Sequence, residues 1–353
     1  MNYYKFAQDL IYWYEMSKRD LPWRKTKDPY LIWLSEIILQ QTRVNQGLPY
    51  YLKFAETYPT LQNLAAAEEN DVLRLWQGLG YYSRARNMLK TARFISHDLN
   101  GVFPKTYKDL LKLKGIGRYT AGAIASFAYD ELVPVVDGNV MRVLSRVFGV
   151  FEDISSAKGQ NVFIELAGKI LPKDSCDTFN QALMEFGAIT CMPKKPKCEE
   201  CIFNHTCYAY KKDHISSLPV KIKRQIKTER TLSYFVISQN NKLLMRQRKE
   251  KDIWKGLFEF YLKENHFETL SEYLPDEVLI NMEENCVEII SPTETTTHVL
   301  THQIIKARFW EIRLKKGVEI PLKSDNLKFY SIEEITGLPK SILIMKYLNK
   351  NIF

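Results

Sequence analysis

The spacing of hydrophobic residues changes once along this chain, between residues 208 and 228. Before this stretch, apolar residues recur with the period of helices separated by short loops. After it, apolar and polar residues alternate as they do in half-buried strands. The stretch itself is rich in lysine and contains Pro219, as is typical of a linker. The pattern therefore predicts an all-α domain over residues 1–207, a basic linker over 208–228 and an α+β domain over 229–353.

Individual elements follow from the same pattern. Asp28 is suited to cap a helix that starts at Pro29, because proline is favoured at the first helical position. The predicted helices of the first domain are 28–44, 60–76, 81–99, 108–114, 118–129 and 139–148. The predicted strands of the second are 231–238, 242–248, 257–262 and 304–314, followed by one or two helices over 331–348.

Four cysteines lie close together near the end of the helical region. The gaps within Cys191, Cys198, Cys201 and Cys207 are six, two and five residues. Because the chain carries no secretion signal, the cluster indicates a metal site rather than a disulfide framework. Zinc sites usually present two close pairs, whereas one close pair with wider flanking gaps favours a four-cysteine iron–sulfur cluster. Zinc remains the alternative.

The charge of the chain favours a polyanionic partner. Its formal net charge is +9 at pH 7. Hydrophobic residues make up 45% of the chain, as is ordinary for a globular protein. No apolar run approaches the length of a membrane span, so a soluble, intracellular protein is expected. Lys194, Lys195 and Lys197 lie in the loop between Cys191 and Cys198. They either contact phosphates or offset the negative charge of a thiolate-bound cluster.

Residues 108–128 have the features of a helix-hairpin-helix. The sequence K-D-L-L-K-L-K-G-I-G-R-Y-T-A-G-A-I-A-S predicts two helices joined by a tight turn at Gly115 and Gly117. Backbone N–H groups of such a turn, at a helix N-terminus, can hold a phosphate. The element is therefore expected to grip the DNA backbone without reading its sequence.

Two carboxylates are candidates for acid–base chemistry. Glu36 lies in P-Y-L-I-W-L-S-E-I-I-L-Q-Q-T, with no cation at the neighbouring helical positions, so burial is expected to raise its pKa as suits a general acid. Asp137 ends V-P-V-V-D just before a helix. Its position alone favours N-capping, a role that is compatible with catalysis.

Together, the cysteine spacing, L-K-G-I-G-R-Y-T-A-G-A-I, V-D-G-N-V and S-E-I-I-L-Q-Q-T resemble the helix-hairpin-helix iron–sulfur DNA glycosylases, and among them the MutY-type adenine glycosylases. The resemblance covers essentially the whole chain. It implies an all-α helix-hairpin-helix glycosylase domain with a 4Fe-4S module, followed by an α+β MutT-like domain. The implied partner is double-stranded DNA with adenine opposite 8-oxoguanine or guanine, from which a flipped-out adenine is cleaved.

The resemblance also implies roles for single residues. Glu36 protonates the departing adenine, and Asp137 stabilises or captures the sugar cation. Tyr119 and Asn139 would support the catalytic site, and Arg24 and Gln181 would contact the adenine. The residues that would wedge into the base stack are Gln41, Leu79 and Tyr81, and the four cysteines would be the cluster ligands. Glycosylases that also cleave the backbone carry lysine where this chain has Tyr119, which implies a monofunctional enzyme.

The C-terminal domain is expected to recognise 8-oxoguanine. The metal-binding R-E-x-x-E-E run of related pyrophosphohydrolases does not follow W-K-G-L-F-E-F, which argues against hydrolysis. Leu300, Thr301 and His302 stand where the family has Phe-Ser-His, and threonine keeps the hydroxyl. The alternatives are an endonuclease III-like glycosylase and lyase, or a catalytically silent DNA-binding protein with a cluster. A monomer in a bacterial cytoplasm is expected.

Overall fold

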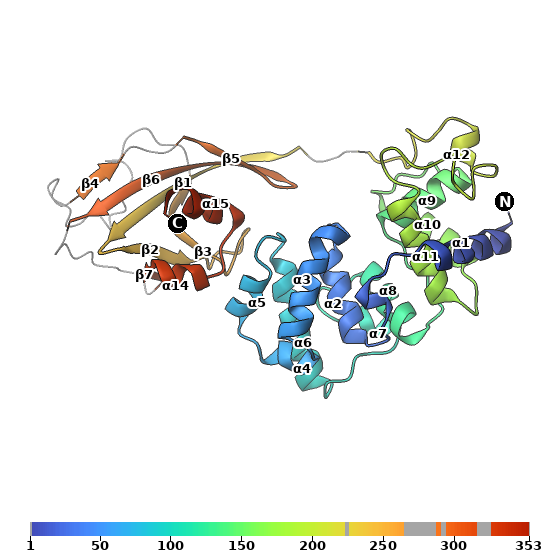
Figure 1. The fold of residues 1–353 in the computed structure, drawn as a ribbon, viewed down its shortest axis with the longest axis horizontal. Helices are drawn as coiled ribbons and strands as arrows, with labels where there is room; N and C mark the ends of the chain where they lie inside the picture. Colours follow the sequence, from blue (N-terminus) through green and yellow to red (C-terminus); the bar gives the residue numbers. More distant parts are fainter. Residues whose placement is uncertain (1, 223–225, 265–286, 291–293, 316–325, 353) are drawn as a thin grey trace. The chain divides into compact units, whose positions relative to one another are not determined.

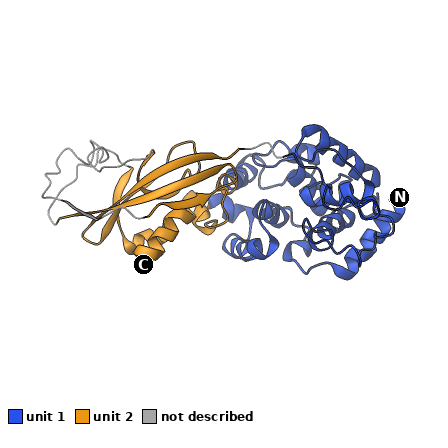
Figure 2. Cartoon of the chain, turned by 90° about the horizontal axis from the view of Figure 1, so that it is seen from above, with its two compact units in different colours: residues 1–66, 87–223 blue, residues 67–86, 224–353 orange. Residues whose placement is uncertain are grey.

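The computed structural model describes residues 2–222, 226–264, 287–290, 294–315 and 326–352. The chain divides into two compact units, which Figure 2 distinguishes by colour. The first consists of residues 1–66 and 87–223, and the second of residues 67–86 and 224–353. The second unit therefore combines the predicted α+β region with a short helical segment.

The N-terminal two thirds of the chain is helical, as predicted (Figure 1). Its elements are α1 (Tyr3–Ser17), the 3₁₀ helix η1 (Pro22–Arg24), α2 (Pro29–Leu39), α3 (Val44–Thr57), α4 (Leu61–Ala66), α5 (Glu69–Leu75), α6 (Ser83–Asp98), α7 (Tyr107–Leu110), α8 (Arg118–Tyr129), α9 (Gly138–Phe148), α10 (Ala157–Ile170), α11 (Cys176–Ile189) and α12 (Tyr208–Lys211).

Four of the predictions for this region are wrong. The helix expected over 108–114 is the shorter α7, which ends at Leu110. The helix expected over 28–44 ends at Leu39, because the backbone leaves the helical conformation at Gln40 (ψ 118°) and Gln41 follows in a left-handed conformation (φ 57°). The helix expected over 60–76 is two helices, α4 and α5. A short helix, α12, lies inside the predicted linker. The prediction for 118–129 is confirmed to the residue as α8.

A core of aromatic and aliphatic side chains joins α1, α9, α10 and α11. Phe6, Phe163, Phe179 and Phe186 are all buried in it. Removing a phenylalanine side chain from water contributes about 1.5–3 kcal/mol, so this cluster fixes how the four helices pack. At one crossing, Gly187 of α11 lies so close to α9 that a Cβ there would be 2.7 Å from the Asn139 Cβ and 2.9 Å from its carbonyl oxygen.

The described strands of the second unit form one seven-stranded sheet in the order β4-β6-β1-β3-β2-β7, with β5 pairing β6. They are β1 (Thr228–Gln239), β2 (Lys242–Gln247), β3 (Phe258–Glu264), β4 (Val287–Ile290), β5 (Thr296–Val299), β6 (Gln303–Leu314) and β7 (Leu327–Ser331). β1 and β6 run parallel, from Thr228 opposite Gln303 to Ser238 opposite Arg313, and the other pairs are antiparallel. The four predicted strands are confirmed as β1, β2, β3 and β6.

Two helices, α14 (Ile332–Gly337) and α15 (Ile342–Asn351), close this fold. Leu343, Ile344 and Leu348 of α15 share a buried core with alternate residues of β1 and β6, such as Tyr234 and Phe309. Because side chains alternate between the faces of a sheet, these helices cover one face. The prediction of one or two closing helices is confirmed.

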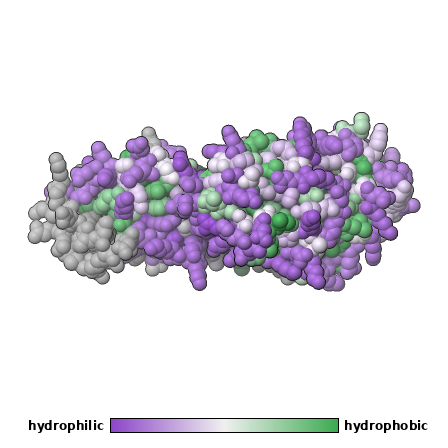
Figure 3. All heavy atoms as spheres, turned by 90° about the horizontal axis from the view of Figure 1, so that it is seen from below, coloured by the Kyte–Doolittle hydropathy of each residue, from purple (hydrophilic) through white to green (hydrophobic). Residues whose placement is uncertain are grey.

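Polar side chains dominate the face of the molecule drawn in Figure 3, with only small hydrophobic patches among them. Among the described helices, none combines the length and the apolar character needed to cross a membrane.

Candidate active site

Glu36 is held in the buried face of α2. Asp28 caps this helix by accepting a hydrogen bond from the Tyr30 N–H at 2.8 Å. Glu36 is only 5% exposed, and the Tyr119 hydroxyl donates to its Oε2 at 2.5 Å. Burial raises the pKa of Glu36 to about 7, although the Tyr119 hydrogen bond opposes this increase. The carboxyl is therefore protonated in a large fraction of molecules near neutral pH.

Asp137 caps α9, as its sequence position predicts. Its Oδ1 accepts from the Val140 N–H at 2.8 Å, and its Oδ2 accepts from the Asn139 side chain at 2.7 Å. The Asn139 oxygen accepts in turn from Arg142 at 2.8 Å. Burial raises the pKa of Asp137, and the hydrogen bonds from Val140 and Asn139 oppose that rise.

The predicted site residues of the helical unit gather around two hollows. Glu36, Arg24 and Gln181 line one of them, which we call the Glu36 pocket. The second, the Asp137 cleft, is lined by Gln41, Gly115, Gly117, Tyr119 and Asp137. Tyr119 links the two, because it lines the cleft while its hydroxyl reaches Glu36. This arrangement can receive a planar base in the pocket and its sugar and phosphate in the cleft.

Behind Arg24 and Gln181, which line the Glu36 pocket, lie three residues that the sequence did not reveal: Arg19, Glu185 and Tyr14. Arg24 donates to Glu185 at 2.7 Å, and Arg19 donates to the same carboxylate with two nitrogens, at 2.7 and 2.6 Å. Burial alone would raise the pKa of Glu185, but these hydrogen bonds lower it to about 2. The Tyr14 hydroxyl donates to the Gln181 side-chain oxygen at 3.1 Å. Glu185 was detectable in principle, as a charged residue among apolar neighbours on α11.

The predicted hairpin turn has a backbone that only glycine fits well. Gly115 adopts φ +80°, and a Cβ there would lie 2.9 Å from the Asn87 Cβ. Gly117 precedes the first residue of α8, and nothing lies within 4 Å of where its Cβ would be. This open space would let a phosphate approach the N-terminus of α8.

Within the second unit, Leu79, Tyr81, Thr301 and His302 line one pocket. The Tyr81 and Thr301 hydroxyl groups form a hydrogen bond. Tyr81 has φ 48°, a conformation that is strained for a residue other than glycine. Such residues cluster at functional sites, and Gln41 in the first unit shares this property.

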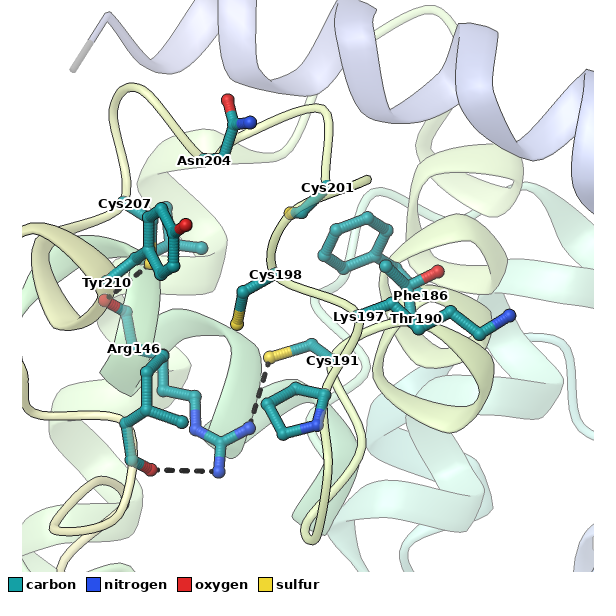
Figure 4. Close-up of a pocket in the computed structure, with 13 residues that line it drawn as sticks. Arg146, Phe186, Thr190, Cys191, Lys197, Cys198, Cys201, Asn204, Cys207 and Tyr210 are labelled. Atoms are coloured by element: carbon teal, nitrogen blue, oxygen red, sulfur yellow. Dashed lines mark hydrogen bonds between the residues drawn. The ribbon is translucent and has the colours of Figure 1, made fainter.

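The four cysteines line a single pocket, shown in Figure 4. Arg146 of α9 donates to the Cys191 sulfur at 3.5 Å, and the Cys207 thiol donates to the Arg146 carbonyl at 3.3 Å. Burial raises the pKa of Cys201 to about 11, and the neighbouring cysteines add to this rise. A bound cation would favour the ionised form of Cys201, against the effect of burial.

The four cysteines are suitable ligands for a metal cluster. Among the described residues, however, no group of three or more His, Cys, Asp or Glu side chains is already arranged around a metal position. Four thiol donors from one loop share one pocket with a buried guanidinium, which would compensate thiolate charge. Lys194 and Lys195 are exposed on the loop between the first two cysteines, and Lys197 lines the pocket.

Comparison with known proteins defines the class. Residues 34–167 match the HhH-GPD superfamily of base excision DNA repair proteins, and residues 233–350 match the NUDIX domain. The fold is similar to that of a thermostable thymine-DNA glycosylase, with a TM-score of 0.54 and 31% identity over 60% of this chain and 97% of that chain. An endonuclease III–DNA complex has a similar fold, with a TM-score of 0.52 and 22% identity over 60% of this chain and 98% of that chain. The molecule is therefore a DNA glycosylase of the helix-hairpin-helix class with a Nudix-like C-terminal domain.

Curated relatives narrow this class to one family. The chain is 33% identical to the adenine DNA glycosylase of Buchnera aphidicola subsp. Acyrthosiphon pisum over the whole of both chains. It is 40% identical to that of Buchnera aphidicola subsp. Schizaphis graminum, over 74% of this chain and 75% of the relative. The identity with the Rattus norvegicus adenine DNA glycosylase is 42%, over 61% of this chain and 44% of that protein. This chain belongs to the adenine DNA glycosylase family, so the resemblance seen in the sequence motifs is confirmed.

Proposed function

We propose that this enzyme removes adenine that lies opposite 8-oxoguanine or guanine in double-stranded DNA, by hydrolysing the N-glycosidic bond of a flipped-out nucleotide. The observation that carries the proposal is the buried Glu36 carboxyl, which lines a pocket together with Arg24 and Gln181 and has a pKa of about 7. A general acid of that pKa is protonated and still a good donor near neutral pH.

The two carboxylates divide the chemistry between them. Glu36 donates a proton to a ring nitrogen of adenine, which makes the base a neutral leaving group. The hydrogen bonds from Val140 and Asn139 favour the ionised form of Asp137, although burial raises its pKa. The ionised carboxylate faces the positive charge that develops on the sugar. Two carboxyl groups with different surroundings can thus act as acid and as electrostatic stabiliser.

Tyr119 supports a monofunctional reaction. A lyase needs an amine that attacks the sugar and forms a Schiff base, and a phenol cannot do this. In a nicking assay on an A·8-oxoguanine duplex, we expect free adenine and strand cleavage only after alkali. Cleavage without alkali would instead support an endonuclease III-like lyase. The absence of product would support a silent DNA-binding protein.

We also propose that Cys191, Cys198, Cys201 and Cys207 hold a 4Fe-4S cluster. The bound cluster would supply a rigid anchor for the loop, while Lys194, Lys195 and Lys197 contact DNA phosphates. Iron and acid-labile sulfide in the purified protein would support this assignment, whereas stoichiometric zinc would contradict it. The monomeric state and the cytoplasmic location expected from the sequence are part of the same proposal.

The pH dependence of excision tests the acid role of Glu36. Only the protonated form donates, so the single-turnover rate should fall about tenfold per unit above pH 7. The rate should also fall in acid, where Asp137 is protonated and loses the charge that faces the sugar. The Tyr119 hydrogen bond lowers the pKa of Glu36, so Tyr119→Phe should move the falling limb to higher pH. Tyr30→Phe removes a buried hydroxyl from the same α2 and should leave the limb unchanged. An unshifted limb in Tyr119→Phe would contradict this coupling.

Thr301 and His302 are proposed to meet the 8-oxoguanine. Thr301→Val with His302→Ala should reduce the preference for 8-oxoguanine over guanine by about 1–3 kcal/mol, the usual loss for one good polar base contact. The measurement is the ratio of single-turnover rates and affinities on the two duplexes. Thr297→Val, on exposed β5, is the control. An unchanged ratio would show that these residues do not read the opposite base.

A further inference from the structure

The Glu36 pocket has a second-layer residue, Tyr14, that touches both predicted base contacts. Tyr14 lies on α1, is only 3% exposed, and comes from a part of the chain far from α11 in sequence. Its hydroxyl donates to the Gln181 side-chain oxygen at 3.1 Å. The Arg24 guanidinium lies over its ring, with the Cζ 5.4 Å from the ring centre.

The two base contacts depend on Tyr14 to different degrees. Arg24 is held independently, by Glu185 at 2.7 Å and by the Arg19 carbonyl at 3.1 Å. In the part of the chain that the structure describes, the Gln181 amide has one hydrogen-bond partner, the Tyr14 hydroxyl. Loss of the hydroxyl would therefore release Gln181 but not Arg24.

The hydroxyl also favours one of the two amide orientations. If the amide turned over, its NH₂ group would face the hydroxyl, and the buried phenol hydrogen would lose the acceptor that it has among the described residues. Burying an unsatisfied donor is costly, so the hydroxyl holds the amide with its oxygen toward Tyr14. That oxygen keeps a second lone pair, and the NH₂ group keeps its hydrogens, so both can still meet a base.

The orientation of a primary amide decides which purine it accepts. Adenine has an amino donor at position 6 and a bare acceptor at N1. A 6-oxopurine has the opposite pattern, with an acceptor at position 6 and a donor at N1. A fixed amide matches one pattern, and an amide that can turn over matches either.

We propose that Tyr14 is a positioning residue that fixes the Gln181 amide and thereby makes the pocket select a 6-aminopurine over a 6-oxopurine. This inference rests on the proposed function, in which the Glu36 pocket receives the flipped base. Tyr14 itself does not line the Glu36 pocket, so it acts through Gln181.

The test compares single-turnover excision of adenine and of hypoxanthine, each placed opposite 8-oxoguanine. Tyr14→Phe keeps the ring under Arg24 and removes only the hydroxyl. We expect the adenine-to-hypoxanthine rate ratio to fall roughly tenfold, as for the loss of one buried polar interaction. The control is Tyr30→Phe, whose lost hydroxyl donates to the Tyr58 carbonyl at 2.6 Å, away from the pocket. Its ratio should equal that of the unmodified enzyme.

A second variant shows whether Tyr14 acts through Gln181. Gln181→Leu removes the amide and should lower the ratio, and adding Tyr14→Phe to it should cause no further change. A wild-type ratio in Tyr14→Phe or in Gln181→Leu would overturn the proposal, as would an additional loss in the double variant. Failure of the proposed function itself would look different, because the unmodified protein would then release no adenine.

Discussion

Glu36→Gln should bind mispaired DNA with normal affinity and excise adenine about 10²–10⁴-fold more slowly, the usual contribution of a general acid. Glutamine has nearly the same shape as the protonated carboxyl, so the packing of α2 should survive. It can still accept the Tyr119 hydrogen bond, but it cannot give up a proton to the base. Single-turnover rates, together with equilibrium DNA binding, measure both parts of this result.

The fold should tolerate this change well. Burial already raises the pKa of Glu36 to about 7, so ionisation of this group destabilises the folded state as the pH rises through that value. The amide has no such ionisation, and the variant should be at least as stable as the wild type in alkaline solution. Excision within a few-fold of the wild-type rate would remove Glu36 from the mechanism.

Asp137→Asn should lower the excision rate by about 10²–10³, the scale seen when one electrostatic contact to a developing charge is lost. Asparagine caps helices about as well as aspartate, and its oxygen can still accept from the Val140 N–H, so the start of α9 should be preserved. The NH₂ group that replaces Oδ2 cannot accept from Asn139, so the melting temperature should fall only by the loss of that one hydrogen bond. The substitution therefore separates the charge of Asp137 from its capping role.

The matched control for this variant is Asp28→Asn, the same substitution at the N-cap of α2. Asp28 accepts from the Tyr30 N–H at 2.8 Å, much as Asp137 accepts from Val140. Asp28 lines neither the Asp137 cleft nor the Glu36 pocket, so the excision rate of Asp28→Asn should match that of the wild type. If Asp137→Asn is as active as Asp28→Asn, capping is the whole role of Asp137.

Local sequence signals predicted only some of the elements whose ends are chemically marked, since α1 and α10 were missed although Asn2 and Ser156 cap them. Both ends of α8 were predicted correctly. Gly117 precedes its first residue, and Asp130, whose φ is 56°, ends it. α2 was predicted too long, because Gln41 adopts a left-handed backbone conformation and glutamine is not a residue type that signals one. The short strands β4, β5 and β7 were missed, since four or five residues are too few to display an alternating pattern.

The candidate site was predictable to the extent that it depends on neighbours along the chain. The burial of Glu36 could be expected from the apolar residues around α2, and the capping by Asp137 from its place before a helix. The hydrogen bond from Tyr119 to Glu36 joins residues 83 positions apart, and that from Tyr14 to Gln181 joins residues 167 apart. Only the packing of the helices brings such pairs together.

The close crossing at Gly187 has a consequence for reading mutational data on this enzyme. Any side chain at this position would push Asn139 and the first turn of α9 out of place, and Asp137 caps that turn. A mutational scan that ranks positions by loss of excision activity would then place Gly187 as high as Glu36 and Asp137, although Gly187 has no side chain to offer a substrate. Tolerance of substitution in this protein therefore maps the fit between two helices as much as the chemistry that they carry.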